Sequence, residues 1–488
     1  MIASERISFG TDGWRGKIAE TFTFDNVRRA AQGFALFLKH KGISEKGVVI
    51  GYDQRFNSDL FARASAEVLA GNGIKVWFTC RNTPTPVISY TVVERQAAGA
   101  INITASHNPP EDNGFKVRDS RGAAIPPVDL SEIEAFIPDL VTGVKICEFY
   151  KGCKEGVIEI WDPDDAYIKH IKTIVDLEAL KNAGKKIVCD VMWGNAAGWY
   201  PRLLGGGSNQ IIEVHNERNP IFPNMERPEP IHPNIDEGMK RLLEEKGDIL
   251  FINDGDADRQ GIGDENGEYI DQLRVASLLT YYMLEYKNER GAIIKTVNMS
   301  SMLDRLAAVY DVSLIETPVG FKYVANAFIN ESAIIGCEES GGYAFRNNIP
   351  ERDGILGNLL FLEFMVKTGK TPSELVQMLF EKLGANFYYR RIDKVCTEEE
   401  RNRALETLSL AFPKEICGFP VNGVDTTDGY KYKLGNLGWL MVRVSGTEPL
   451  VRIYCEVINQ KMVAPLLQAG LELIGILDRK ESFDKVSI

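Results

Sequence analysis

Short apolar segments rich in valine and isoleucine alternate along the chain with longer amphipathic segments. GVVIGYD (residues 47–53) and GAINIT (residues 99–104) have the length and composition of buried strands. FDNVRRAAQGFALFLKHKG (residues 24–42) carries its apolar residues at helical spacing. Because alternation of such strands and helices is typical of the α/β class, the pattern predicts an α/β fold.

The alternation changes near residue 388. KVCTEEERNRALETLSLAF (residues 394–412) has the composition of a helix, and GWLMVRVSG and LVRIYCEV have the pattern of strands in a small antiparallel sheet. We therefore expect a smaller α+β domain at the end of the chain. With further changes near residues 148 and 268, the predicted domains are residues 1–148, 149–268, 269–387 and 388–488.

Length, composition and charge exclude several classes of protein. With 488 residues, 44% hydrophobic and 25% charged, the chain is typical of a globular protein of several domains. A net charge of −12 argues against nucleic acid or an anionic membrane as a partner, because either requires an extended basic face. The first residues lack a signal-peptide stretch and no apolar run reaches the ~18 residues of a membrane helix, so we expect a cytoplasmic protein.

The eight cysteines are spread along the chain without a C-x-x-C pair. Many have apolar neighbours, as in IVCDV and IYCEV, and a chain of this length does not need disulfide bonds for stability. We therefore expect buried free thiols that do not bind metal. The sequence does not determine the oligomeric state.

An acidic loop follows the apolar run DILFIND. In NDGDADRQGIGDENG, Asp254, Asp256 and Asp258 occupy alternate positions, and three hard carboxylates so placed suit a cation such as Mg²⁺. An EF-hand is an alternative, since Glu265 falls at its twelfth position, but Arg259 occupies the sixth, where glycine is needed. A solvated acidic turn is the other alternative. Arg259 argues against it, because a cation beside three carboxylates indicates that an anion also binds there.

The segment TASHNPPEDNGFKV (residues 104–117) combines a serine, a histidine, an Asn-Gly turn and a lysine. Ser106 lacks the G-x-S-x-G setting of a hydrolase nucleophile, and His107 is too close in sequence to act easily as its base. Ester hydrolysis is therefore a poor fit. A surface loop shaped by its prolines, with a solvated Lys116, remains an alternative.

Two further segments could bind a phosphorylated sugar. In RVSGTEPLVR, hydroxyls, a glycine amide and two flanking guanidinium groups could surround one phosphate, although a hairpin turn with exposed arginines is the alternative. In GCEESGGY, an extended backbone would place Glu338 and Ser340 on the same side, where they could contact paired hydroxyls. Lys322 in TPVGFKYV and Arg15 in FGTDGWRG could also belong to such a site, or be structural.

In their order along the chain, FGTDGWRG, TASHNPPEDNGFKV, DGDADR, GCEESGG and RVSGTEPLVR resemble the motifs of the α-D-phosphohexomutases, the superfamily of phosphoglucomutase and phosphomannomutase. The resemblance spans residues 9–454. It implies three related mixed α/β sheet domains and a smaller α+β C-terminal domain around a central cleft. It also implies a reversible reaction in which a phosphoserine gives its phosphate to a hexose phosphate, and a hexose 1,6-bisphosphate intermediate turns around and returns its other phosphate.

The resemblance implies a role for each candidate residue. Ser106 would be the phosphoserine, and Asp254, Asp256 and Asp258 would hold Mg²⁺ together with its phosphate. Positive groups of the reaction centre would be Arg15, His107, Lys116 and Arg259, with Lys116 or His107 transferring the proton. Substrate-binding residues would be Lys322, Glu338 and Ser340 for the sugar, and Arg443, Ser445, Gly446, Thr447 and Arg452 for the phosphate that does not react.

Two of these motifs also bear on which sugar phosphate is the substrate. EESGG and TPVGFKYV are more similar to the phosphoglucomutases than to the glucosamine mutases, whose loop usually resembles EQSGH. We expect glucose phosphate as the preferred substrate and mannose phosphate as a second. A phosphoglucosamine mutase, a non-catalytic sensor of sugar phosphate and a Ca²⁺-binding protein are the alternatives.

Overall fold

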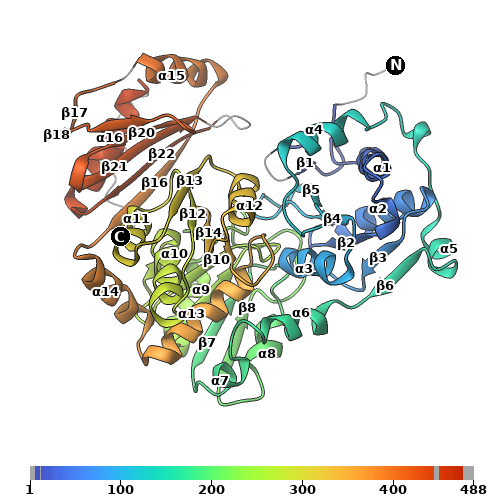
Figure 1. Ribbon diagram of the computed structural model, residues 1–488, viewed down its shortest axis with the longest axis horizontal. Coiled ribbons are helices and arrows are strands. Elements are labelled where there is room, and N and C mark those ends of the chain that lie inside the picture. The colour runs from blue at the N-terminus through green and yellow to red at the C-terminus, as the bar shows by residue number, and fades with distance from the viewer. Residues whose placement is uncertain (1–5, 11–12, 411, 445–449, 476–488) are drawn as a thin grey trace.

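The computed structural model describes residues 6–10, 13–410, 412–444 and 450–475. The chain forms three mixed sheets covered by helices and a fourth, antiparallel sheet near the C-terminal end (Figure 1). In Figure 1 the first sheet lies at the right and the last at the upper left, with the second and third between them. The expected fold of three mixed α/β domains and a smaller α+β domain is confirmed.

The first sheet has the strand order β1-β5-β4-β2-β3-β6, in which β2, β3, β4 and β6 are parallel and β1 and β5 run as an antiparallel edge. The strands are β1 (Trp14–Lys17), β2 (Val48–Tyr52), β3 (Val76–Thr79), β4 (Gly99–Ile103), β5 (Asp112–Arg118) and β6 (Ile158–Trp161). The helices are α1 (Phe24–His40), α2 (Ser58–Gly71), α3 (Thr85–Arg95), α4 (Pro127–Ala135) and α5 (Phe149–Lys154). The strand β6 thus extends this sheet past residue 148, and the domain limits themselves stay predictions.

The second sheet, in the order β11-β10-β9-β7-β8, follows the same plan. Its strands are β7 (Lys186–Asp190), β8 (Gln210–Val214), β9 (Ile249–Asn253), β10 (Gln260–Gly263) and β11 (Tyr269–Ile270). Its helices are α6 (Asp164–Ile171), α7 (Leu177–Lys181), α8 (Trp199–Leu204) and α9 (Asp236–Glu245).

The third sheet has the order β13-β12-β14-β15. Its strands are β12 (Ile293–Thr296), β13 (Leu314–Thr317), β14 (Ile335–Cys337) and β15 (Tyr343–Phe345). Its helices are α10 (Gln272–Tyr281), α11 (Ser301–Tyr310), α12 (Phe321–Asn330), α13 (Gly354–Thr368) and α14 (Pro372–Leu383).

One feature recurs in all three mixed sheets and positions the candidate site. The strands β4, β9 and β14 each pair in parallel with one neighbour and antiparallel with the strand that follows them in the chain. The connection after each is a loop at the carboxyl end of a central parallel strand, where ligands of α/β sheets gather. These loops are residues 104–111, 254–259 and 338–342, which contain three of the candidate motifs.

The last sheet is antiparallel, in the order β16-β22-β21-β20-β19. Its strands are β16 (Tyr388–Val395), β19 (Gly423–Asp425), β20 (Tyr430–Lys433), β21 (Gly438–Val444) and β22 (Leu450–Val457), with a separate ribbon of β17 (Glu415–Ile416) and β18 (Phe419–Pro420). Its helices are α15 (Glu398–Leu410) and α16 (Val463–Leu473), and α16 packs on β22.

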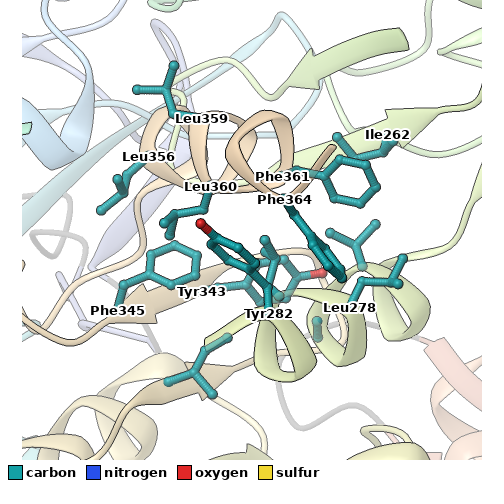
Figure 2. Close-up of a cluster of buried hydrophobic side chains, with 14 of the residues drawn as sticks. Ile262, Leu278, Tyr282, Tyr343, Phe345, Leu356, Leu359, Leu360, Phe361 and Phe364 are labelled. Atoms are coloured by element: carbon teal, nitrogen blue, oxygen red, sulfur yellow. The ribbon is translucent and has the colours of Figure 1, made fainter. Parts of the chain in front are cut away.

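A helix buried on nearly all sides joins the second and third sheets. Leu360, Phe361 and Phe364 of α13 pack in one cluster with Tyr343 of β15 and Ile262 of β10 (Figure 2). The apolar composition of α13, GILGNLLFLEFMVKT, therefore reflects burial between two sheets. No helix among the described residues is both long enough and apolar enough to span a membrane.

The expectation that the cysteines are buried is only partly right. All eight are free, and four of them are buried, but Cys80 and Cys417 are exposed. Cys80 directly follows β3, and Cys417 lies in the tight turn between β17 and β18 with a φ of 49°. Apolar neighbours in the sequence do not bury a residue that lies in a connecting segment.

Replacing Leu360 by alanine should lower the free energy of unfolding by about 2–5 kcal/mol, because this side chain is 1% exposed and its loss leaves a cavity. A matched control is Leu140→Ala, whose side chain is 60% exposed and whose loss should cost less than ~0.5 kcal/mol. Denaturant unfolding followed by circular dichroism measures both. Equal effects of the two changes would contradict the packing of α13.

Candidate active site

The three repeated loops and the last sheet enclose one cavity of about 1020 Å³. The loop after β9 is joined to the loop after β14 by a β-bridge between Arg259 and Gly342, and by a hydrogen bond from the Gln260 N–H to the Gly341 carbonyl. Side chains from all four sheet regions line the cavity. Among the candidates these are Arg15, His107, Arg259, Lys322, Glu338, Ser340, Arg443 and Arg452.

Ser106 lies directly after β4 in a left-handed backbone conformation, with a φ of 53°. Its N–H donates to Thr104 Oγ1 at 2.8 Å, and its Oγ donates to Asp254 Oδ2 at 2.7 Å. Gly255 permits this approach, because a Cβ there would lie 2.6 Å from the Ser106 carbonyl oxygen. The serine and aspartate loops, which are about 150 residues apart in the sequence, are thus in direct contact.

The three aspartates after β9 form a compact, fully buried group. Asp254, Asp256 and Asp258 each offer a carboxylate oxygen within 4.8 Å of the others. Burial, then the charges of its two neighbours, raise the pKa of Asp254 well above its ordinary value. Burial alone would also raise the pKa of Asp256, but Lys116, a Thr85 hydrogen bond and Arg352 hold it below its ordinary value.

The donor set of this group fits Mg²⁺. Its oxygens are hard ligands, and among the described residues Asp256 Oδ1 and Asp258 Oδ1 are buried without a hydrogen-bond donor. The Oγ of Ser106 contacts the same group through Asp254. These residues could therefore hold a divalent cation next to the serine.

Cations from three sheet regions surround the carboxylates. Lys116 of β5 is fully buried, with its Nζ 3.1 Å from Asp256 Oδ2 and 3.7 Å from Asp258 Oδ2. The Nε of Arg259 lies 3.9 Å from both Asp254 Oδ2 and Asp258 Oδ1. The structure therefore brings Lys116 and Arg259 to the aspartates, as the motifs predict for a reaction centre.

Sequence reasoning missed a third cation, Arg352, which precedes α13. One of its Nη atoms lies 2.6 Å from Asp258 Oδ2 and the other lies 3.3 Å from Glu338 Oε2, so it connects the metal loop to the candidate sugar loop. Gly342 makes room for it, since a Cβ there would lie 2.2 Å from Arg352 Cδ. In the sequence Arg352 is only an arginine just before a helix. Its role cannot be recognised until the start of that helix is known to face the cavity.

His107 lies beside the serine, with its Nδ1 3.4 Å from Ser106 Oγ. Burial, followed by the charges of Arg259, Arg15 and other cations, lowers the pKa of His107 well below its ordinary value. The imidazole is therefore neutral near pH 7 and can accept a proton. Arg15, from β1, donates to Asn108 Oδ1 at 2.7 Å and lines the same end of the cavity.

Arginines of the last sheet line the opposite wall. Arg443 and Arg452 are directly opposite each other on β21 and β22, and like charges so placed are destabilising unless an anion or an acid compensates them. Arg443 Nε lies 3.0 Å from Asp428 Oδ1, and Arg452 Nε lies 3.5 Å from Asp393 Oδ2. Ser445, Gly446 and Thr447, which complete the predicted phosphate site, lie outside the described residues.

An ion pair that the motifs did not indicate, between Glu339 and Arg391, connects the last sheet to the predicted sugar-binding loop. Glu339, between the two predicted sugar-binding residues, accepts from the Tyr389 hydroxyl at 2.6 Å and lies 3.1 Å from an Nη atom of Arg391. Arg391 belongs to β16 and also lines the cavity. Lys322, at the start of α12, also lines the cavity.

Comparison with known proteins assigns the chain to a family. Four domain descriptions of phosphoglucomutase/phosphomannomutase match it: α/β/α domain I at residues 6–141, domain II at 165–267, domain III at 271–383 and the C-terminal domain at 398–469. The chain belongs to the phosphoglucomutase/phosphomannomutase family. It is accordingly a phosphohexomutase, an isomerase that moves a phosphoryl group within a sugar phosphate.

Individual relatives of this family cover nearly the whole chain. A phosphoglucomutase/phosphomannomutase of Thermococcus kodakarensis is 31% identical over 96% of this chain and 98% of its own length. A protein named "probable phosphoglucosamine mutase" from Methanosphaera stadtmanae is 29% identical over 92% of this chain and 94% of its own. A crystal structure assigned to the phosphomannomutases, from Thermus thermophilus, is 33% identical with a TM-score of 0.84 and covers 97% of this chain and 100% of that one. The family is therefore clear, and its names leave the sugar open.

Mg²⁺ should raise the melting temperature of this phosphohexomutase, because the cation relieves repulsion among three buried carboxylates. At a Mg²⁺ concentration of 100 times Kd the stabilisation is about 2.7 kcal/mol. Asp258→Asn should abolish most of the shift, whereas Asp139→Asn, an exposed control, should retain it. Thermal unfolding with and without Mg²⁺ measures the difference, and an undiminished shift in Asp258→Asn would rule out this site.

Proposed function

We propose that the chain interconverts hexose 1-phosphates and hexose 6-phosphates through a phosphorylated Ser106, with glucose phosphate preferred and mannose phosphate as a second substrate. The observation that carries this proposal is the contact of Ser106 Oγ with the buried aspartate group, next to His107 and Arg259, which line a cavity rich in arginines. A serine so placed can carry a phosphoryl group whose charge is met on several sides.

In the forward reaction a hydroxyl of the bound sugar phosphate attacks the phosphorus of phosphoserine, and the bond to Ser106 Oγ breaks. Mg²⁺ held by Asp254, Asp256 and Asp258 would supply neutralisation of the charge on the phosphoryl group. Lys116 and Arg352, which contact Asp256 and Asp258, add positive charge close to the transferred group. The neutral His107 or the adjacent Lys116 exchanges the proton between the sugar hydroxyl and Ser106.

Turnover requires that the resulting hexose 1,6-bisphosphate rebinds with its ends exchanged. Arg443 and Arg452, together with Ser445, Gly446 and Thr447 as the family motif implies, would hold whichever phosphate is not reacting. Their positions in the lining of the cavity support this role, because two guanidinium groups on neighbouring strands can bind one phosphate together. Glu338, Ser340 and Lys322 would contact the sugar between the two phosphate sites, and holding it at both ends aligns the attacking hydroxyl.

A phosphoglucosamine mutase and a non-catalytic sensor of sugar phosphates are the alternatives. The loop GCEESGG supports the glucose and mannose phosphates over the amino sugar, as the motif comparison above indicates. The sensor is disfavoured, since binding alone does not require a serine in contact with a buried group of aspartates.

Ser106→Ala should abolish turnover and leave the fold intact, because Oγ contacts only the side chains of Asp254 and His107 among the described residues and its loss leaves no large cavity. The matched control is Ser131→Ala on the exposed face of α4, which should behave as wild type. Mutase activity and circular dichroism give the two readouts. Wild-type turnover by Ser106→Ala would refute a phosphoserine mechanism.

The substrate preference is tested in one mixture of glucose 1-phosphate, mannose 1-phosphate and glucosamine 1-phosphate at equal concentration, with Mg²⁺ and traces of the hexose 1,6-bisphosphates. We expect ³¹P spectra to show the 6-phosphate of glucose first, that of mannose next and that of glucosamine last. Faster conversion of glucosamine phosphate would assign the chain to the phosphoglucosamine mutases. Binding without any conversion would favour the sensor.

A further inference from the structure

A buried arginine contacts the serine loop without lining the cavity. Arg55 is 1% exposed and follows β2, the strand that pairs in parallel with β4. No motif considered above includes it. Its guanidinium nevertheless donates four hydrogen bonds to backbone carbonyl groups within and next to the Ser106 loop.

The contacts of Arg55 follow the loop from one end to the other. One Nη donates to the carbonyl oxygen of Ser106 at 2.7 Å and to that of Asn108. The other Nη donates to the carbonyl oxygens of Pro109 at 2.7 Å and Asp112 at 3.1 Å. A planar group with five donors can satisfy four carbonyls at once, whereas the ammonium of lysine has three donors and no fixed plane.

Arg55 is itself held from three directions. Its Nε lies 3.3 Å from Asp53 Oδ2, and the other carboxylate oxygen of Asp53 accepts from Ser58 Oγ at 2.6 Å. The ring of Phe222 lies over the guanidinium at 4.9 Å, and Arg218 donates to the Arg55 carbonyl at 3.3 Å. Because the last two residues come from the region of the second sheet, the guanidinium position is fixed by both sheet regions that contribute to the reaction centre.

The loop needs such a support. Residues 109 and 110 are prolines, which have no N–H to share in a hydrogen-bond ladder, and Ser106 adopts a φ of 53°. A left-handed conformation at a non-glycine residue is unfavourable unless the surroundings enforce it. The direction of Ser106 Oγ toward Asp254 depends on that conformation, because the loop would otherwise turn the side chain elsewhere.

We propose that Arg55 is a positioning residue of the mutase reaction, which holds the Ser106 loop in the conformation that aims Oγ at the aspartates. This inference rests on the proposed phosphoserine mechanism. Arg55 does not touch the substrate, and it acts through the carbonyl groups of the loop. Its removal should therefore slow phosphoryl transfer and leave sugar-phosphate binding nearly unchanged.

The test compares Arg55→Lys with Arg29→Lys. Arg29 is a matched control in the same domain, 5% exposed, whose guanidinium donates to the Pro138 carbonyl and to Asn26 Oδ1 far from Ser106. Each protein is mixed with glucose 1,6-bisphosphate and Mg²⁺, and intact-protein mass spectrometry follows phosphorylation of Ser106 with time. Steady-state kcat and KM and the melting temperature are measured in parallel.

We expect Arg55→Lys to phosphorylate Ser106 and to turn over about 100-fold more slowly than wild type, with KM within ~3-fold, as for a misplaced reacting group. Arg29→Lys should keep wild-type rates even if its melting temperature falls as far. Added guanidinium ion should raise the rate of Arg55→Ala by at least ~10-fold, because the free ion supplies the missing hydrogen-bond donors. Wild-type rates in Arg55→Lys, or equal losses of rate in both lysine variants, would overturn the inference.

Phe222→Leu provides a second variant in case Arg55→Lys does not fold. It loosens the guanidinium without touching the loop, and we expect phosphorylation of Ser106 to slow by ~3–10-fold, which is ~0.7–1.4 kcal/mol. An unchanged rate in this variant would count against the inference. The wild-type protein separates failure of the proposed function from failure of the Arg55 proposal. If the wild-type protein takes up no phosphoryl group, the proposed function fails. If it is phosphorylated and Arg55→Lys is phosphorylated at the same rate, only the role of Arg55 fails.

Discussion

Three carboxylates buried within 4.8 Å of one another are the constraint on which the rest of this structure depends. Such a group is tolerated in a protein interior only when compensating charge is close, because burial of unpaired charge is costly. Here the charge comes from Lys116 in the first sheet region, Arg259 beside the aspartates and Arg352 at the start of α13. Ion pairs at this group thus connect all three mixed sheet regions, in addition to apolar packing.

The repeated strand-loop-strand unit explains how one sequence plan serves three tasks. The loops after β4, β9 and β14 occupy the same place in their sheets, and one presents the serine, the next the aspartates and the third the predicted sugar-binding residues. Loops at equivalent positions in three related domains would face different directions if the domains were arranged in a line. Contacts such as the Arg259–Gly342 bridge keep them pointing to one cavity.

Much of this could be predicted from the sequence, and the exceptions have physical reasons. Alternating apolar runs identified the α/β class, and the motif residues Arg15, His107 and Arg259 lie in the lining of one cavity, while their roles stay predictions. Arg55, Arg352 and Arg391 could not be found in this way. Each acts through a partner distant in the sequence, and an arginine acquires meaning from the carbonyl or carboxylate that it meets after folding.

The burial of α13 between the second and third sheets has a consequence for cooperativity. One large core includes side chains from both of these sheets and also Trp439, Met441 and Tyr454 of the last sheet, whereas most buried apolar side chains of the first sheet and of the last sheet form cores of their own. The chain thus has four domains in its family pattern, and the last three of them share one continuous apolar core. Opening of the last sheet, which contributes the distal arginines, would therefore expose part of this core. The arginines of the last sheet and the sheet that holds the aspartates are thus coupled through apolar packing as well as through the cavity that both line.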